Sequence, residues 1–487
     1  MLPRHVQRKL RSSICTPMHT RSMAYWSEED KAERAQRARE LQDVVIVGGG
    51  IVGSALACNL KSNPVFHGKK VTVIEPSPPN KLDDANAPLG IPDARVYTIT
   101  PASKKLFEAI GVWDKIKPEH IAPFGHMQVW DAMGDGFIRF DAAKAQVKNG
   151  RDLGYVLEHG VLQRALALRM EELASQDDPN PLQVLSPAEV RNFEGPGEVQ
   201  RAGIVHLEDG REIRSRLVVA ADGGKSMIRK LSALGTWGWT YDQQAVVATV
   251  KTDQINTTAW QRFLPSGPIA LLPLRDGYSS VVWSTNENHA IELKSISPEE
   301  FVAELNEALN KPSETPSPPQ IPILGNLFQG IHLAAQTVLA AGALADPFQS
   351  PPKATEAVGR RVSFPLKLQH ATRYSKYGVA LIGDSAHSIH PLAGQGLNLG
   401  LADVTSLGNL LSQGVQAGVH LGDEQFLQNY DNDRKKANIS MALAMDGFKN
   451  LFGPAPDAVL VARNVGMSSL NAVDPVKTQI MKYAMGL

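Results

Sequence analysis

The stretch VVIVGGGIVGSALACNL, residues 44–60, decides the fold of the first half of this chain. Four β-branched apolar residues run up to Gly48, and a small-residue segment follows the glycines. This pattern predicts a buried parallel strand that leads directly into a helix. The next apolar run, VTVIE, ends at Glu75, so the two strands and the helix between them form one β-α-β unit.

Glycines at the end of the first strand match the G-x-G-x-x-G pattern of dinucleotide-binding folds. Gly48 permits the tight turn, Gly50 lets the backbone approach a pyrophosphate, and Gly53 lets helix and strand pack closely. Glu75 ends the second strand, where its carboxylate can bind ribose hydroxyls. Glycines also mark ordinary turns, but the ordered strand, helix and acid favour a dinucleotide site. The pattern does not distinguish FAD from NAD.

In two later segments an acidic residue again stands at the end of an apolar strand. RLVVAADGGKSMIRK, residues 216–230, carries Asp222, and GVALIGD, residues 378–384, ends in Gly383 and Asp384. The carboxyl ends of parallel strands line the crevice in which open α/β sheets bind ligands. The sequence therefore predicts that these acids meet the glycine turn at one edge of the sheet.

The segment GDSAHSIHPLAGQGLNLG, residues 383–400, allows two rival chemistries. A hydrolase serine at Ser385 would need G-x-S-x-G, and the fifth residue here is His387. His387 and His390 have the i, i+3 spacing of a helical metal site, but Pro391 and the glycines argue against a helix. We predict no metal site, and we expect both histidines to be packed or hydrogen-bonded.

The order of these motifs resembles that of the FAD-dependent aromatic hydroxylases built like para-hydroxybenzoate hydroxylase. The resemblance implies FAD as cofactor, with Glu75 on the adenosine ribose and Asp384 on the ribityl chain. It places Arg95, in DARVYTIT, near the pyrophosphate. Further cofactor-binding residues are Asp222 and Gly383. A turn built by Pro391, Gly394, Gln395 and Gly396 brings backbone amides close to the isoalloxazine, at the positive end of a helix starting near Leu397.

Three segments narrow the resemblance to the branch that hydroxylates the ring in mitochondrial ubiquinone biosynthesis: AWQRFLPSGPIALLPL (259–274), 383–400, and NAVDPVKTQIM (471–481). This implies oxygen transfer from O2, through a flavin C4a-hydroperoxide, to a polyprenylated phenol. It also implies electrons from a ferredoxin and its reductase, and other ubiquinone-biosynthesis proteins at the membrane as partners. No residue that deprotonates the phenol can be named. A flavin-dependent prenyl-lipid reductase or dehydrogenase, and a flavin-bearing structural component of a biosynthetic complex, are the alternatives.

Composition and the N-terminus suggest where the protein works. The 487 residues carry 50 basic and 50 acidic side chains, which gives no reason to expect nucleic acid as a partner. Residues 1–27 are basic and rich in Ser and Thr, with no acid before Glu28, as in a mitochondrial transit peptide. No run of about 20 apolar residues predicts a membrane span. We expect a peripheral protein on the matrix side of the inner membrane.

The predicted fold is α/β: a Rossmann-type FAD-binding domain interleaved with a strand-rich substrate domain and followed by a helical C-terminal tail. The FAD-binding domain is expected in three parts, 42–126, 151–236 and 370–412. The substrate domain is expected in two parts, 127–150 and 237–369, and the helical region at 413–487. A break in the final helices is expected at FGPAPDA, residues 452–458.

Overall fold

The computed structural model describes residues 40–78, 90–145, 152–197, 201–313, 346–390 and 394–486. The chain divides into two compact units, Met1–Leu41 and Gln42–Leu487, and the account below concerns the second. The predicted transit peptide and Pro391 lie outside the described residues.

The first sheet is the predicted Rossmann-type sheet. Its strands run in the order β17–β18–β11–β1–β2–β8, and every pairing from β18 to β8 is parallel. An antiparallel pair, β9 and β10, extends from β11. The strands are β1 (Gln42–Val47), β2 (Val71–Ile74), β8 (Gln183–Leu185), β9 (Val190–Glu194), β10 (Gly203–Leu207), β11 (Glu212–Ala220), β17 (Ser375–Lys376) and β18 (Val379–Leu381).

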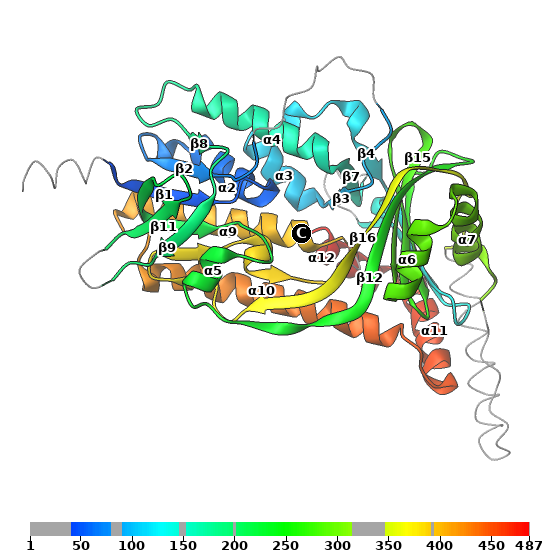
Figure 1. Ribbon diagram of the computed structural model, residues 1–487. Coiled ribbons are helices and arrows are strands. Elements are labelled where there is room, and N and C mark those ends of the chain that lie inside the picture. Colours follow the sequence, from blue (N-terminus) through cyan, green and yellow to red (C-terminus); the bar gives the residue numbers. More distant parts are fainter. Residues whose placement is uncertain are drawn as a thin grey trace, which may run out of the picture. The chain divides into compact units, whose positions relative to one another are not determined.

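Helices α2 (Ile51–Ser62), α4 (His159–Ala174) and α9 (Gly396–Ala417) bury the apolar surface of this sheet. Figure 1 shows α2 next to α9, and the two helices contact each other closely because Gly408 of α9 lies against Asn59. A Cβ atom at position 408 would lie 2.0 Å from the Asn59 Oδ1 atom. The short helix α5 (Met227–Leu231) follows β11.

The second sheet has the order β19–β16–β12–β15–β14–β13–β5–β6. Figure 1 shows that the two longest strands of this sheet, β12 and β16, extend beneath the first sheet. Helices α6 (Glu287–Ser295) and α7 (Pro298–Asn310) pack on one face and build a second core. The strands are β5 (His126–Asp131), β6 (Phe137–Asp141), β12 (Thr236–Thr252), β13 (Thr258–Leu264), β14 (Gly267–Pro273), β15 (Tyr278–Thr285), β16 (Ala354–Ala371) and β19 (His387–Ser388).

A small sheet and the C-terminal helices complete the described fold. The sheet has the order β3–β7–β4, with β3 (Val96–Ile99), β4 (Ala122–Phe124) and β7 (Gly154–Glu158), and α3 (Pro101–Ala109) follows β3. The final helices are α10 (Glu424–Leu451), α11 (Asp457–Ala472) and α12 (Asp474–Ala484). The 3-10 turns are η1 (Pro64–Phe66), η2 (Trp113–Lys115), η3 (Pro118–His120), η4 (Ala142–Ala145), η5 (Arg275–Gly277) and η6 (Gly383–Ser385).

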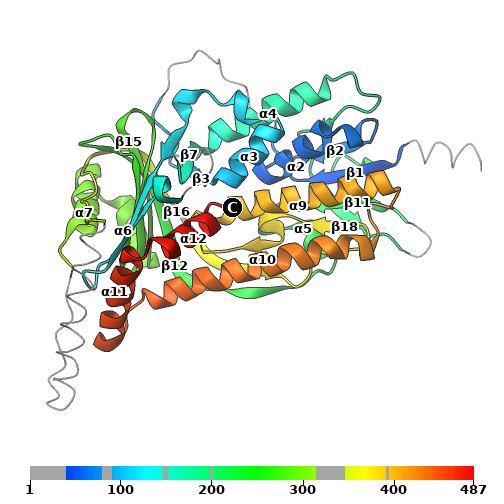
Figure 2. The ribbon, with the colours of Figure 1, turned by 180° about the vertical axis from the view of Figure 1, so that it is seen from behind.

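The end of the chain returns to the first sheet's helices. Figure 2 shows α12 ending beside α9 and α3, and the Ala102 N–H donates to the Met485 carbonyl at 3.3 Å. At its other end, the Lys477 Nζ atom lies 2.6 Å from the Asp346 Oδ2 atom. The predicted fold class is confirmed, and so is the helix break, because α10 ends at Leu451 and α11 begins at Asp457.

Candidate functional site

The turn after β1 requires glycine at two of the predicted positions. Gly48 has φ +107°, and a Cβ atom there would lie 2.3 Å from the Ala221 carbonyl oxygen. A Cβ atom at Gly53 would lie 2.0 Å from the Gly48 carbonyl oxygen, so a side chain would push α2 away from the turn. Both glycines therefore hold the first turn of α2 close to the ends of β1 and β11.

Gly50 serves a different purpose. It is the residue before α2, and a Cβ atom there would meet nothing within 4 Å. No side chain caps this end of the helix. The start of α2 thus has no capping side chain and has open space beside Gly50, which is the arrangement that binds phosphate groups.

Glu75 lies directly after β2 and its carboxylate closes over the glycine turn. The Gly49 N–H donates to Oε2 at 2.7 Å, and the Ser77 N–H donates to Oε1 at 2.9 Å. The side chain remains partly exposed. These two bonds fix the carboxylate at the strand end next to the anion-binding turn.

Asp222 and Ser385 brace the ends of β11 and β18 against each other. The Ser385 hydroxyl donates to Asp222 Oδ1 at 3.0 Å and accepts the Gly223 N–H at 3.0 Å. The other Asp222 oxygen accepts the Met227 N–H at 2.7 Å. The Arg229 Nη1 atom donates to the Ser385 carbonyl at 2.7 Å. Ser385 is buried within this brace, so its hydroxyl is not a free nucleophile.

Asp384 is the exposed residue of η6, and Gly383 before it has φ +57°. Among the described residues, none donates a hydrogen bond to the Asp384 carboxylate. The surrounding protein desolvates the group and raises the pKa of Asp384, although His387, Lys367 and Arg95 oppose the shift. The carboxylate is thus accessible to solvent and also enclosed by protein, as expected for a group that lines an open crevice.

Asp403, on α9, holds the turn that carries Asp384, a role that the sequence analysis did not predict. Its Oδ2 atom accepts the Gly383 N–H at 3.0 Å and lies 2.6 Å from His387 Nε2, and its Oδ1 atom accepts Arg434 Nε at 2.9 Å. Burial opposes ionisation, but His387 and Arg434 outweigh it and hold the pKa of Asp403 below its usual value. The only signal was that Asp403 is the single charged residue of an otherwise uncharged helix.

The two histidines of the segment differ from each other. His387 is hydrogen-bonded to Asp403, which confirms its predicted structural role. His390 is packed, but neither of its ring nitrogens has a hydrogen-bond partner among the residues that the structure describes. Within the described part of the chain, no three His, Cys, Asp or Glu side chains gather closely enough to hold a metal ion.

Arg95 lies across the crevice, exposed just before β3. Its guanidinium carbon is 5.6 Å from the centre of the Tyr97 ring. The Tyr97 hydroxyl lies 3.1 Å from His159 Nδ1. Burial, and then the charge of Arg95, lower the pKa of His159. The structure therefore brings a cation and two aromatic side chains toward the Asp384 edge.

The turn into α9 is built for close backbone approach. Gly394 has φ +62°, Gln395 precedes the helix and Gly396 begins it, with no side-chain cap at that end. Asn398 anchors the turn, because its Nδ2 atom donates to the Thr98 carbonyl at 2.8 Å and its Oδ1 atom accepts the Ser103 hydroxyl at 2.8 Å. The first amides of α9 are thus available to a ligand.

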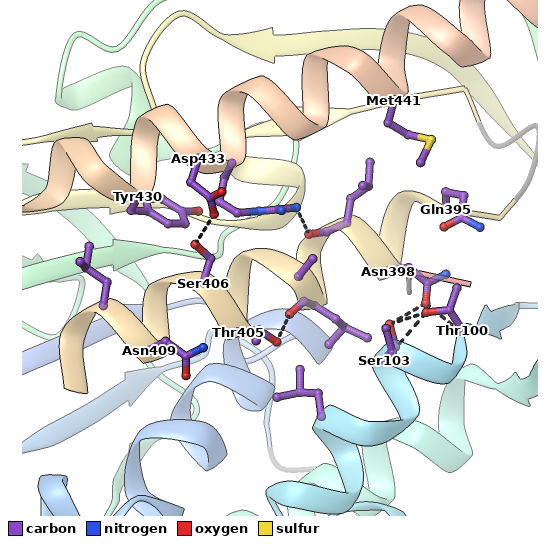
Figure 3. Close-up of a pocket in the computed structure, with 18 of the residues that line it drawn as sticks. Thr100, Ser103, Gln395, Asn398, Thr405, Ser406, Asn409, Tyr430, Asp433 and Met441 are labelled. Atoms are coloured by element: carbon purple, nitrogen blue, oxygen red, sulfur yellow. Dashed lines mark hydrogen bonds between the residues drawn. The ribbon is translucent and has the colours of Figure 1, made fainter. Parts of the chain in front are cut away.

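A cavity of about 580 Å³ lies on another side of α9, between α3, α10 and the end of α12. Figure 3 shows Gln395 and Met441 at one end of it, and Ser406 facing Asp433 farther along. Of the predicted site residues only Gln395 lines it. The cavity thus reaches the turn into α9 through Gln395 and Asn398.

The residues of the crevice fit a flavin dinucleotide. Open amides at α2 suit a pyrophosphate, the carboxylates of Glu75 and Asp384 suit two sets of hydroxyls, and the uncapped start of α9 suits the electron-rich edge of a flavin.

Comparison with known proteins agrees with this fit. The profile of the FAD binding domain family matches residues 42–326 and 343–443. The chain is 38% identical over 450 residues to the "Ubiquinone biosynthesis monooxygenase COQ6, mitochondrial" of Xenopus tropicalis, covering 91% of this chain and 93% of that protein. It is also 38% identical to the Homo sapiens protein of the same name over 451 residues, covering 91% and 92%.

Among solved structures, the fold is similar to p-nitrophenol 4-monooxygenase PnpA from Pseudomonas putida. The TM-score is 0.63 at 19% identity, covering 91% of this chain and 96% of that one. It is also similar to pqsL, a probable FAD-dependent monooxygenase from Pseudomonas aeruginosa, with a TM-score of 0.62 at 18% identity, covering 88% and 99%.

Proposed function

The chain belongs to the FAD binding domain family as an FAD-dependent monooxygenase, and from that premise we propose that its substrate is a polyprenylated phenol of ubiquinone biosynthesis. Ring hydroxylation is the reaction that this substrate class and cofactor support together. The observation that carries the proposal is the similarity to ubiquinone-biosynthesis monooxygenases along nine-tenths of both chains.

We assign the cofactor contacts by the geometry of the crevice. Gly48, Gly50 and Gly53 admit the pyrophosphate to the start of α2, and Glu75 binds the adenosine ribose. Asp384 binds the ribityl hydroxyls, because its carboxylate is open and Asp403 holds the N–H of the preceding residue, Gly383.

The remaining predicted residues act around these contacts. Arg95 neutralises charge beside the pyrophosphate. Asp222 positions the crevice rather than filling it, since both of its oxygens already accept hydrogen bonds. The amides from Gly394 to Gly396 face the flavin ring. Reduced FAD supplies the chemistry by activating O2 and delivering one oxygen atom to the ring.

We propose that an apolar cluster of side chains from β13, α10 and α11 lines the path of the prenyl tail. Phe263 stacks on Phe452 with ring centres 3.9 Å apart. Met441, Met445 and Met467 pack around this pair. Methionine side chains adapt readily to flexible apolar ligands, so this cluster suits the first isoprene units of a tail.

We further propose that the protein works in mitochondria, attached to the matrix face of the inner membrane, as the relatives' mitochondrial name suggests. Every helix in the described residues is too short or too polar to cross a bilayer. We propose a ferredoxin and its reductase as the electron source. Exposed Lys225 and Lys230, next to Asp222 in sequence, offer charges for a small acidic partner.

The proposal is tested by deleting the gene and identifying the lipid that accumulates. We expect a polyprenylated phenol lacking one ring hydroxyl, and reintroduction of the wild-type chain should remove it. Accumulation of an oxidised prenyl lipid with all hydroxyls present would indicate a reductase instead.

A further inference from the structure

His390 is a buried histidine with unused hydrogen-bonding capacity. Its side chain is 1% exposed, and neither ring nitrogen has a partner among the residues that the structure describes. It follows β19 and lies four residues before Gly394 in the sequence. Buried polar groups nearly always have partners, so an imidazole with two free nitrogens calls for an explanation.

The polar groups around His390 are engaged with one another. Its ring meets the Tyr241 ring edge-on, with centroids 5.1 Å apart. The Tyr241 hydroxyl donates to Asp446 Oδ1 at 3.0 Å, and the other Asp446 oxygen accepts Asn450 Nδ2 at 3.1 Å. The Lys449 ammonium lies 4.6 Å from the centre of the Tyr241 ring. None of these groups bonds to the imidazole.

The imidazole is neutral at physiological pH. Burial, and then the positive charge of Lys449, lower the pKa of His390 to about 4, although Asp446 opposes the shift. A neutral imidazole carries one N–H donor and one nitrogen acceptor. A hydroxyl group, which also donates and accepts, is its natural complement.

The setting of His390 is otherwise apolar and close to the apolar cluster described above. Its neighbour Ile389 packs against the Phe263 and methionine cluster and also against the cluster of Tyr241, Leu366 and Leu368. His390 is therefore a polar side chain between the second sheet and α10, next to this apolar cluster.

We propose that His390 contacts the substrate, with its free ring nitrogen accepting a hydrogen bond from the phenol hydroxyl, and that the Tyr241–Asp446 pair positions the imidazole. This deepens the proposed function and rests on it. The hydrogen bond draws the phenolic proton toward nitrogen, which makes the ring more electron-rich and more reactive toward an electrophilic oxygen.

The test uses the FAD-loaded full chain and two probes, 2-prenylphenol and its methyl ether, titrated against the flavin absorbance spectrum. Wild type should bind the phenol roughly tenfold more tightly than the ether, because the ether cannot donate. H390L should bind both equally, with FAD affinity unchanged and thermal stability unchanged or higher, since an unpartnered polar group has left an apolar setting. H390F keeps a ring against Tyr241 and should behave as H390L does.

Two further variants sharpen the result. H390Q keeps an acceptor and should restore part of the preference for the phenol. W283F is the matched control, because Trp283 Nε1 is also buried with no hydrogen-bond partner among the described residues, but belongs to the core beneath α6 and α7. W283F should keep the full wild-type preference.

The outcomes separate the two proposals. If wild type binds both probes equally, His390 has another partner, such as an ordered water, and the inference is overturned. The inference is also overturned if H390L and H390F still bind the phenol more tightly than the ether. If these variants keep that preference but bind FAD more weakly, His390 contacts the cofactor instead of the substrate. If neither probe perturbs the wild-type flavin, the phenol substrate itself is wrong.

Discussion

At the scale of single residues, Asp384 is the most direct test of the crevice. Its carboxylate is exposed and has no hydrogen-bond donor among the described residues, so Asp384→Ala removes a cofactor contact and almost no internal contact. We expect FAD occupancy after purification to fall by about tenfold or more, while the melting temperature of the apoprotein changes little. The ratio of flavin to protein absorbance measures the first, and calorimetry measures the second. Full occupancy in this variant would remove Asp384 from the site.

Asp403 should behave in the opposite way, because it is buried among charged partners. Asp403→Asn leaves Arg434 without its counter-ion, and breaking such a buried pair costs about 3–5 kcal/mol of the free energy of unfolding. Urea unfolding measures this loss. Asp433→Asn is the control on the neighbouring helix, since its exposed carboxylate accepts one hydrogen bond from Ser406 and should matter little.

The difference in the free energy of unfolding between wild type and Asp403→Asn changes with pH in a definite direction. The folded-state pKa of Asp403 is lowered, so its stabilisation is fully present above its ordinary pKa, about 3.9, and is lost as the pH falls through the folded-state value. Wild type and Asp403→Asn should therefore still differ at pH 5 and converge only in stronger acid. Convergence near pH 6 would show that another group is responsible.

The residues that sequence could predict are those tied to strand ends. Gly48, Glu75 and Asp384 follow apolar strands at fixed spacing, so their place in the fold follows from the β-α-β pattern. Asp403 could not be found this way, because its partners come from other elements and no local spacing relates them. Asp222 follows the end of β11, as its apolar strand predicts, but its contact with Ser385 appears only when β11 and β18 lie side by side.

At the scale of elements, α12 presents an unusual surface. Val476, Ile480 and Tyr483 lie on one helical face and are 43%, 39% and 57% exposed, whereas Lys477 and Met481 on the other face are buried. Such a face suits the interface of a membrane. Replacing Val476 and Ile480 together by Glu should weaken binding to cardiolipin-containing vesicles by about tenfold without loss of FAD.

Vesicle flotation measures that binding. Val419→Glu is the control, since Val419 is 38% exposed but lies outside α12. Equal flotation of the double variant and wild type would show that α12 does not contact the lipid.

Elements of the first sheet were easier to predict than those of the second. Parallel strands follow one another with helices between, so periodicity and glycine turns suffice. The second sheet pairs β5 with β13 in parallel across more than a hundred residues, and no local pattern encodes that pairing. The proposed domain boundaries stay a prediction.

At the scale of the whole molecule, the source of the electrons tests which proteins are the partners of this chain. A ferredoxin docked by charge should reduce the flavin rapidly when its reductase and NADPH are present, and the rate should fall as salt rises. Anaerobic stopped-flow absorbance measures this with substrate bound. Rapid bleaching by NADPH alone would mean that no ferredoxin is needed.

The central claim is that this chain transfers one oxygen atom from O2 to the ring of a polyprenylated phenol. The most direct measurement is mass spectrometry of the product formed by the FAD-loaded protein under ¹⁸O2, with a reductant and a prenylated phenol. The account predicts a product heavier by one ¹⁸O atom, located on the ring, with no label incorporated from H2¹⁸O. Reduced or unchanged substrate with oxygen consumed, or label arriving from water, would contradict it.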